Sequence, residues 1–466
     1  MTGEKVKEEP IVVGLDIGTT KIAAIVAQRD QFGKLKILGM GKTPSLGVSK
    51  GEVINIKQTT EAIMEAVKEA EKQSGHKITV VYVGIAGQHI SSKQNRGICT
   101  LPKPEEEITR ENIKVMIEDM HRLALDPGER IIHVLPQEFT VDNSHAIKDP
   151  VGMCGSRLEA NFHIITGKVA AAQNIKKCVE RAGLQMLGLI LEPLASSAAV
   201  LHADEMEAGV VLVDIGGGTT DVAIFKDGII RHTAVIPFAG NIITEDIIEG
   251  CKLLRPQAEK LKVIFGSALP NETHENEIIS VPGIAGRDSK EISMRTLAHI
   301  VNARMEEIFA QVFFEIKSSG FVNSLNAGIV ITGGGAQLKH LKQLVEYSTG
   351  LSARIGYPSS YLAKNNKADL SNPMYATGIG LVLKGYDELE DMTELEKSLL
   401  FNPRQEPVIK QADSTPTKTP VEVEQEMEEV GPVVPPKKKG ANLLQQMISS
   451  VKNWFEDENV NGDFER

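Results

Sequence analysis

The stretches LDIGTT (residues 15–20) and VDIGGGTT (residues 213–220) decide the fold of this chain. Each contains an aspartate at the end of an apolar strand, a glycine turn and two threonines. Because this pattern occurs twice, the sequence predicts a core that contains a duplicated unit. Between residues 11 and 401 short Val/Ile-rich runs alternate with longer periodic stretches, which is typical of an α/β protein.

The pattern also predicts individual elements. Strands are expected in the apolar runs at residues 11–18, 21–28, 78–87, 209–218, 220–225 and 327–335. Apolar residues at helical spacing predict helices at Thr59–Ser74, Glu111–Leu125, Lys168–Ala182 and Met294–Lys317.

Length and composition limit the class of protein. A chain of 466 residues with 41% hydrophobic residues is expected to form several compact units. A net charge of -11 argues against a nucleic-acid partner, because the phosphate backbone would be repelled. Four scattered cysteines fit a reducing cytoplasm. No apolar run approaches the roughly 18–20 residues of a membrane span, so we expect neither export nor a spanning helix.

Glycine turns between strands are suited to phosphate binding, because their backbone N–H groups can close on an anion without a Cβ in the way. Each turn alone also fits an ordinary hairpin, but two matched turns and a third glycine cluster favour a nucleotide site. An aspartate at the strand end can hold Mg²⁺ through water. The candidate phosphate and nucleotide residues are Gly18, Thr19, Thr20, Lys21, Gly216, Gly217, Gly218, Thr219, Thr220, Gly333, Gly334 and Gly335.

The two turns, LEPLASSAAV (191–200) and ITGGGAQL (331–338) together resemble the five-motif signature of actins, sugar kinases and heat-shock chaperone ATPases. This resemblance implies an actin-like two-lobed ATPase fold with duplicated ribonuclease-H-like cores and ATP between the lobes. It implies that Asp16 and Asp214 hold Mg²⁺ through water and that Glu192 orients the attacking water, in at most a slow ATPase. Glu259 and Lys262 would face the ribose and base, although their spacing equally fits a solvated helix face.

Four further segments resemble the FtsA family of bacterial cell division proteins. They are HVLPQEFTVD (133–142), IKDPVGMCGSRLEANFHIIT (147–166), RHTAVIPFAGNIITEDI (231–247) and NPMYATGIGL (372–381). Alternatives within the superfamily are an MreB-like or PilM-like ATPase, or a small-molecule kinase. MreB relatives usually carry a membrane helix at the N-terminus, where this chain is polar, and PilM-like proteins lack a long linker with a helix. No additional catalytic base of a kinase is evident.

The resemblance implies a domain order. The first lobe core is expected at 11–87, 166–203 and 372–401, with an FtsA-type inserted subdomain at 88–165. The second lobe core is expected at 204–240 and 324–371, with an insertion at 241–323. Residues 1–10 are expected to be disordered, and the proline-rich, acidic segment 402–440 is expected to be a disordered linker.

Residues 441–457 form an expected amphipathic helix, followed by an acidic tail at 458–466. On a helical wheel its apolar residues fall within an arc of about 140°. Because this stripe follows a long linker and three lysines, we expect it to bind an anionic membrane surface, although docking on the protein itself or on a partner is the alternative. The stripe comprises Leu443, Leu444, Met447, Ile448, Val451, Trp454 and Phe455.

The resemblance also implies partners. FtsA-like proteins hold the C-terminal peptide of FtsZ on the second-lobe insertion, polymerise with themselves, and meet downstream division proteins at the inner face of the membrane. Basic side chains in the matching region are candidates for an acidic peptide, and ordinary surface charge is the alternative. They are Arg287, Lys290, Arg295 and Arg304.

Overall fold

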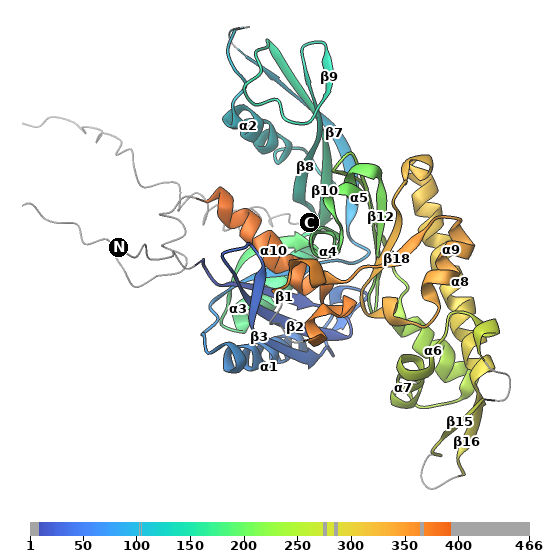
Figure 1. Cartoon of the computed structure of the whole chain (residues 1–466). Coiled ribbons are helices and arrows are strands. Elements are labelled where there is room, and N and C mark those ends of the chain that lie inside the picture. Colours follow the sequence, from blue (N-terminus) through green and yellow to red (C-terminus); the bar gives the residue numbers. More distant parts are fainter. Residues whose placement is uncertain are drawn as a thin grey trace, which may run out of the picture. The chain divides into compact units, whose positions relative to one another are not determined.

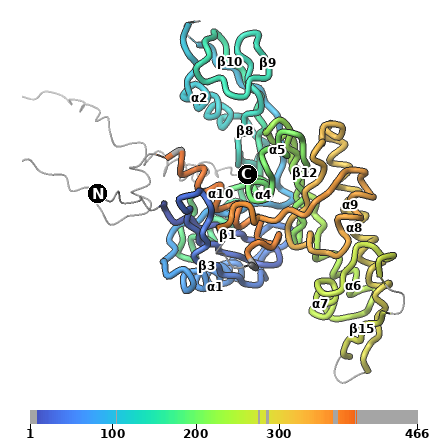
Figure 2. The backbone as a smooth tube through the Cα atoms, viewed as in Figure 1, coloured from blue at the N-terminus to red at the C-terminus, as the bar shows by residue number. Residues whose placement is uncertain are grey.

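The computed structural model describes residues 9–101, 103, 105–273, 277–283, 288–363 and 368–392. Contacts divide the chain into two compact units, Met1–Glu388 and Leu389–Arg466. All sheets described below belong to the first unit, and Figures 1 and 2 show their arrangement.

Within the described residues, two five-stranded sheets have the same topology. In the first, β3, β2 and β1 are antiparallel, and β6 and β11 follow in parallel. In the second, β14, β13 and β12 are antiparallel, and β17 and β18 follow in parallel. This repeated order confirms the predicted α/β class and the duplicated core. The strands are β1 (Val12–Ile17), β2 (Lys21–Arg29), β3 (Leu35–Pro44), β6 (Val80–Ile85), β11 (Gln185–Leu191), β12 (Val210–Ile215), β13 (Thr220–Lys226), β14 (Ile229–Ile236), β17 (Gly328–Thr332) and β18 (Ala353–Ile355).

The central strands are apolar except for Asp16 and Asp214 near their carboxyl ends, because both faces of each sheet are covered. Every residue of β1 and β12 is buried, as expected for strands without a solvent face. On the first sheet α1 packs on β2 and β3, and α3 packs on β11. On the second, α8 contacts β13 and β14, and α9 contacts β18. The helices are α1 (Ile56–Ser74), α3 (Val169–Arg181), α4 (Glu192–Val200), α5 (Ala203–Ala208), α8 (Met294–Ser318), α9 (Leu341–Thr349) and α10 (Ala376–Asp391).

The predicted helices are present with shifted ends. Helix α1 begins at Ile56 rather than Thr59, because the Asn55 side chain accepts a hydrogen bond from the Gln58 amide and caps the first turn. Helix α2 (Arg110–Met120) ends five residues before the predicted end at Leu125. Leu123 and Leu125 still pack on the same core from a turn, so they continued the apolar spacing without continuing the helix.

The segment between β6 and α3 forms a separate antiparallel sheet. Its strand order is β7-β10-β8-β9, and α2 packs on β7 and β8. These elements enclose an apolar core of their own that includes Leu158 and Phe162. The strands are β7 (Ser91–Thr100), β8 (Glu129–Val141), β9 (Ser144–Ile147) and β10 (Arg157–Lys168).

The second sheet carries an insertion between β14 and β17. It contains α6 (Gly240–Cys251), α7 (Arg255–Phe265), the hairpin of β15 (Ile278–Val281) and β16 (Lys290–Ser293), and α8. Their apolar faces join the core beneath the second sheet. A second short hairpin, β4 (Val48–Ser49) and β5 (Glu52–Val53), precedes α1.

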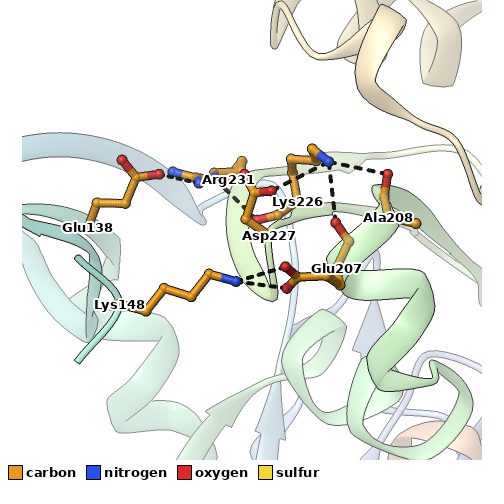
Figure 3. Close-up of polar contacts among 7 residues, drawn as sticks. All are labelled: Glu138, Lys148, Glu207, Ala208, Lys226, Asp227 and Arg231. Carbon is orange, nitrogen blue, oxygen red and sulfur yellow. Dashed lines mark hydrogen bonds and ion pairs between the residues drawn. The ribbon is translucent and has the colours of Figure 1, made fainter. Parts of the chain in front are cut away.

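Polar side chains join the four-stranded sheet to the second five-stranded sheet (Figure 3). Arg231 on β14 donates to Glu138 on β8 at 2.5 Å and to Asp227 at 3.3 Å. Lys148, just after β9, donates to both carboxylate oxygens of Glu207 on α5 at 2.9 Å. The Arg231 side chain is only 13% exposed, whereas Lys148 and Glu207 are 56% and 59% exposed.

This difference in burial predicts different effects of the two basic residues on the free energy of unfolding. Arg231→Ala is expected to lower the free energy of unfolding by about 1–2 kcal/mol, because it removes a largely buried guanidinium that donates to both Glu138 and Asp227. Lys148→Ala, which removes a solvent-screened pair across the same junction, should change it by less than about 0.5 kcal/mol. Urea unfolding of both variants tests this difference, and equal effects would contradict it.

Candidate functional site

A cavity of about 680 Å³ brings the three glycine segments together, a volume typical of small-molecule sites. Its lining includes residues from both five-stranded sheets and from α4, α6 and α7. Of the described residues predicted for nucleotide binding, all except Thr220 line this cavity. The lining includes Asp16, Gly18, Thr19, Thr20, Lys21, Glu192, Asp214, Gly216, Gly217, Gly218, Thr219, Glu259, Lys262, Gly333, Gly334 and Gly335.

The two phosphate-type turns are equivalent in backbone but not in their threonines. The Gly18 amide donates to the Lys21 carbonyl at 3.0 Å, and the Gly216 amide donates to the Thr219 carbonyl at 2.9 Å. Each turn therefore closes over the same number of residues. Thr19 and Thr20 lie inside the first turn, whereas Thr220 already begins β13. The repeated threonine pair in the sequence is thus not a structural repeat.

The glycines of the second turn make room for the threonines of the first. A Cβ on Gly217 would lie 1.8 Å from the Thr20 hydroxyl oxygen, and a Cβ on Gly218 would lie 2.5 Å from that of Thr19. Both distances are too short for a side chain without movement of these threonines, so glycine lets the two turns face each other as they do.

Thr220 is a predicted nucleotide-binding residue that lies outside the cavity lining. Its side chain is fully buried and its hydroxyl donates to the Phe238 carbonyl at 2.7 Å. Because Thr220 is a residue of β13, its hydroxyl is used inside the second sheet and does not line the cavity.

Acidic side chains gather around one lysine. The Lys21 Nζ lies 2.5 Å from Asp16 Oδ2. Burial lowers the pKa of Lys21, but the charge and hydrogen bond of Asp16 outweigh it, so the pKa lies above its ordinary value. Glu192 begins α4 directly after β11, where Pro193 favours a helix start. Burial and the charges of three aspartates raise the pKa of Glu192 well above its usual range.

Asp221 was missed by sequence reasoning. It lines the cavity on β13, directly opposite Asp214 on β12. Burial, then the charge of Asp214, raise the pKa of Asp221 to about 8. Its Oδ2 accepts from the Thr219 hydroxyl at 3.2 Å, while its buried Oδ1 has no partner. The signal was the aspartate that ends the second turn motif, DIGGGTTD (214–221).

Helix α7 contributes Glu259 and Lys262 to the cavity wall, and the Glu259 side chain is at the same time 40% exposed. Lys262 Nζ donates to the Gly240 carbonyl and to Glu259 Oε2, both at 2.8 Å. The Lys262 side chain is 11% exposed, and burial lowers its pKa despite Glu259. The pair therefore ties α7 to the start of α6 beside the second turn.

Direct coordination of a metal by protein alone does not fit this site. Across the described ranges, no three His, Cys, Asp or Glu side chains are grouped closely enough to hold a metal ion. Mg²⁺, however, commonly keeps several waters and takes its other ligands from substrate phosphates. The unpartnered Asp221 Oδ1 and the carboxylates around Lys21 are consistent with a hydrated cation of that kind.

Of the described basic residues predicted for a partner peptide, only Arg304 lines a second, smaller cavity. Arg304 lines a cavity of about 310 Å³ between α6 and α8, and it pairs with both oxygens of Asp246 at 2.7 and 2.9 Å and with Glu307. Lys290 instead donates to the Cys251 carbonyl at 2.6 Å. Arg295 begins α8 without lining that cavity, and Arg287 lies outside the described residues.

The tail stripe from Leu443 to Phe455 also lies outside the described residues, as do the expected linker and acidic tail. Within the part of the chain that is described, no helix has the length and apolar character required to cross a bilayer.

The repeated sheet and the facing glycine turns define an actin-like α/β fold with a cavity between the turns. A solved structure titled as a PilM-PilN type IV pilus biogenesis complex shares this fold, with a TM-score of 0.60, 15% identity, and coverage of 80% of this chain and 98% of that one. Sequence comparison then specifies the family. The family model for cell division protein FtsA matches residues 211–380, and that for the SHS2 domain inserted in FtsA matches residues 87–166.

The chain belongs to the FtsA family. It is 40% identical to the cell division protein FtsA of Pseudomonas aeruginosa, over 83% of this chain and 92% of that protein. It is 37% identical to FtsA of Escherichia coli strain K12, over 84% of this chain and 94% of that protein. The predicted family membership is thereby confirmed.

Proposed function

We propose that this FtsA-family chain binds ATP in the 680 Å³ cavity and links FtsZ filaments to the cytoplasmic membrane at the division site. The observation that carries the nucleotide part is the pair of facing turns at Gly18–Lys21 and Gly216–Thr219. The turns approach so closely that a Cβ on Gly217 or Gly218 would clash with the hydroxyl of Thr20 or Thr19. Such turns supply backbone N–H groups to phosphate oxygens.

The acidic residues of the cavity have two roles in this proposal. Asp16 and Asp214 hold the hydrated Mg²⁺ of bound ATP, whose charge offsets the repulsion between phosphates and carboxylates. Lys21 adds positive charge beside the phosphates and is itself held by Asp16. Glu192 orients the attacking water from the start of α4. Turnover is at most slow, and ATP also serves to hold the two halves of the cleft together.

The FtsZ peptide is assigned to the second-lobe insertion at the smaller cavity around Arg304. That cavity places Arg304 beside the apolar side chain of Ile300, but the carboxylates of Asp246, Glu249 and Glu307 also line it. An acidic peptide has to pair with Arg304 against these like charges. Asp246 already occupies the guanidinium of Arg304 from one side. A peptide carboxylate therefore has to compete with this internal pair or add to it.

Charge reversal of Arg295 and Arg304 is expected to weaken binding of an FtsZ C-terminal peptide about tenfold or more, because an acidic ligand then meets like charge. ATP affinity should not change, since neither residue lines the nucleotide cavity. Fluorescence anisotropy of a labelled peptide measures the loss.

A matched variant separates recognition from folding in this experiment. Arg304→Glu combined with Asp246→Arg restores an ion pair of opposite sense in the same place. If the swapped pair recovers peptide binding, the charge reversal at Arg304 acted through local structure. Unchanged peptide affinity in the Arg295/Arg304 double reversal would remove both residues from the site.

Membrane attachment is assigned to the apolar stripe at residues 441–457. Seven apolar side chains at roughly 1.5–3 kcal/mol each are offset largely by the cost of ordering the segment, so one tail should bind reversibly. Several tails on one polymer bind more firmly because each later contact is intramolecular. Self-assembly would then control how long the protein stays on the membrane.

The proposal is tested by measuring nucleotide binding and liposome co-sedimentation together. The full chain should bind ATP and sediment with anionic vesicles, and a truncation after Gly440 should retain ATP binding but remain in the supernatant. A full chain without ATP affinity overturns the nucleotide assignment. Equal sedimentation of both proteins overturns the anchor.

A further inference from the structure

Two buried hydroxyls on one oxygen of Asp214 are not explained by the phosphate turns. Ser196 on α4 donates to Asp214 Oδ2 at 2.5 Å, and Thr377 on α10 lies 3.3 Å from the same oxygen. The two hydroxyl oxygens are 3.1 Å apart. Ser196 is fully buried and Thr377 is 9% exposed. Water is thus largely replaced by protein donors on this side of the carboxylate.

The number of hydroxyl protons determines which groups donate in the hydrogen bonds of Ser196 and Thr377. Each hydroxyl has one proton, and the short contact assigns the Ser196 proton to Asp214. Thr377 then donates either to Asp214 Oδ2 or to Ser196 Oγ, and in both cases its proton supports the same carboxylate oxygen. No described residue donates to Asp214 Oδ1, which faces the third glycine turn, where a Cβ on Gly333 would lie 2.3 Å away.

The two hydroxyls come from helices that are held together closely. A Cβ on Gly380 of α10 would lie 1.8 Å from the Ala195 carbonyl oxygen of α4, so the two helices touch through backbone next to Ser196 and three residues from Thr377. Neither helix belongs to the hairpin that bears Asp214. The orientation of Asp214 is therefore set by two other parts of the fold.

We propose that Ser196 and Thr377 are positioning residues that hold Asp214 Oδ2, so that Asp214 presents Oδ1 to the hydration shell of nucleotide-bound Mg²⁺. This inference rests on the proposed ATP site. It assigns a function to Ser196, the first serine of EPLASSAAV (192–200), and to Thr377 in ATGIGL (376–381). Neither residue belongs to a phosphate turn. Loss of either donor frees the carboxylate to rotate, and the hydrated cation loses a fixed acceptor.

The test measures ATP affinity of the full chain with saturating Mg²⁺ and with EDTA, using a fluorescent ATP analogue. Ser196→Ala should lower the Mg²⁺-supported affinity about tenfold, as expected for loss of a hydrogen bond to a charged group. Thr377→Val should lower it less, because its contact is longer. Affinity in EDTA should be unchanged in both variants.

Two matched variants complete the experiment. Ser197→Ala makes the same change one residue along α4, where the hydroxyl donates only to the Leu194 carbonyl at 2.8 Å, and it should behave as wild type. Thr377→Ser keeps the hydroxyl and should restore the Mg²⁺ dependence that Thr377→Val loses. Ser196→Cys keeps the packing with a weaker donor, should Ser196→Ala not fold.

The outcomes distinguish failure of the positioning role of Ser196 and Thr377 from failure of the proposed ATP site. Equal losses in Mg²⁺ and in EDTA would mean a structural role and overturn the inference, as would an unchanged Mg²⁺ response in both hydroxyl-deletion variants. A wild-type chain that binds no ATP overturns the proposed function itself and this inference with it.

Discussion

Asp214→Ala is expected to abolish Mg²⁺-dependent ATP binding, with a loss of roughly 100-fold or more in affinity. Asp214 ends the central strand of the second sheet and lines the cavity between the glycine turns. Burial, with a contribution from Asp16, raises the pKa of Asp214 despite its hydroxyl donors. A nearby divalent cation would favour the charged form of Asp214. Removing this carboxylate is therefore expected to remove a binding group for Mg²⁺. Isothermal titration calorimetry with and without Mg²⁺ measures this.

Two companion variants show whether the effect is specific. Asp214→Asn retains an acceptor for the Ser196 and Thr377 hydroxyls and should fold normally while losing Mg²⁺-supported binding. Asp227→Asn changes an aspartate in the β13–β14 turn that is 43% exposed and outside the cavity, and should bind ATP normally. Wild-type affinity in Asp214→Ala would remove this carboxylate from the site.

Replacing Trp454 and Phe455 by glutamate is expected to release the full chain from anionic liposomes. Two charges in the apolar stripe oppose burial among acyl chains and repel the anionic surface. The expected linker at 402–440 has an r.m.s. span of roughly 35 Å by flexible-chain scaling, so the tail is expected to act independently of the cleft. ATP binding should therefore be unaffected. Co-sedimentation measures the release.

The matched control adds the same charge to the other side of the expected helix. Gln445→Glu with Gln446→Glu leaves the apolar stripe complete and should weaken sedimentation far less. If the Trp454/Phe455 variant still sediments with vesicles, or if the wild type never does so, the anchor assignment is wrong. The tail would then bind a partner or the protein itself.

The strongest sequence-based inferences concerned features encoded over a few adjacent residues. An apolar strand, an aspartate and a glycine turn are specified locally, so their repetition correctly predicted two cores with one topology. The same applies to α1, whose start moved only because Asn55 caps it. The end of α2 was wrong because Leu123 and Leu125 pack on the core without being helical, and periodicity cannot distinguish these cases.

Other features depend on which distant segments meet. Thr220 shares a motif with Thr20 but points its hydroxyl to Phe238, because the two turns align by backbone hydrogen bonds and not by matching letters. Arg304 is an isolated basic residue in the sequence, and only the packing of α6 against α8 places Asp246 on its guanidinium.

By itself, the sequence determined the α/β class, the duplicated core, the glycine turns and the membership of the FtsA family, because these follow from local patterns of residue type. Only the tertiary structure decided that Asp221 faces Asp214 across a strand pair and that Ser196 and Thr377 meet on one carboxylate oxygen. Ser196 and Thr377 lie far apart along the chain, on two helices joined by a backbone contact at Gly380. Burial then gives these contacts their strength, because a carboxylate removed from water depends on the few donors that the fold supplies.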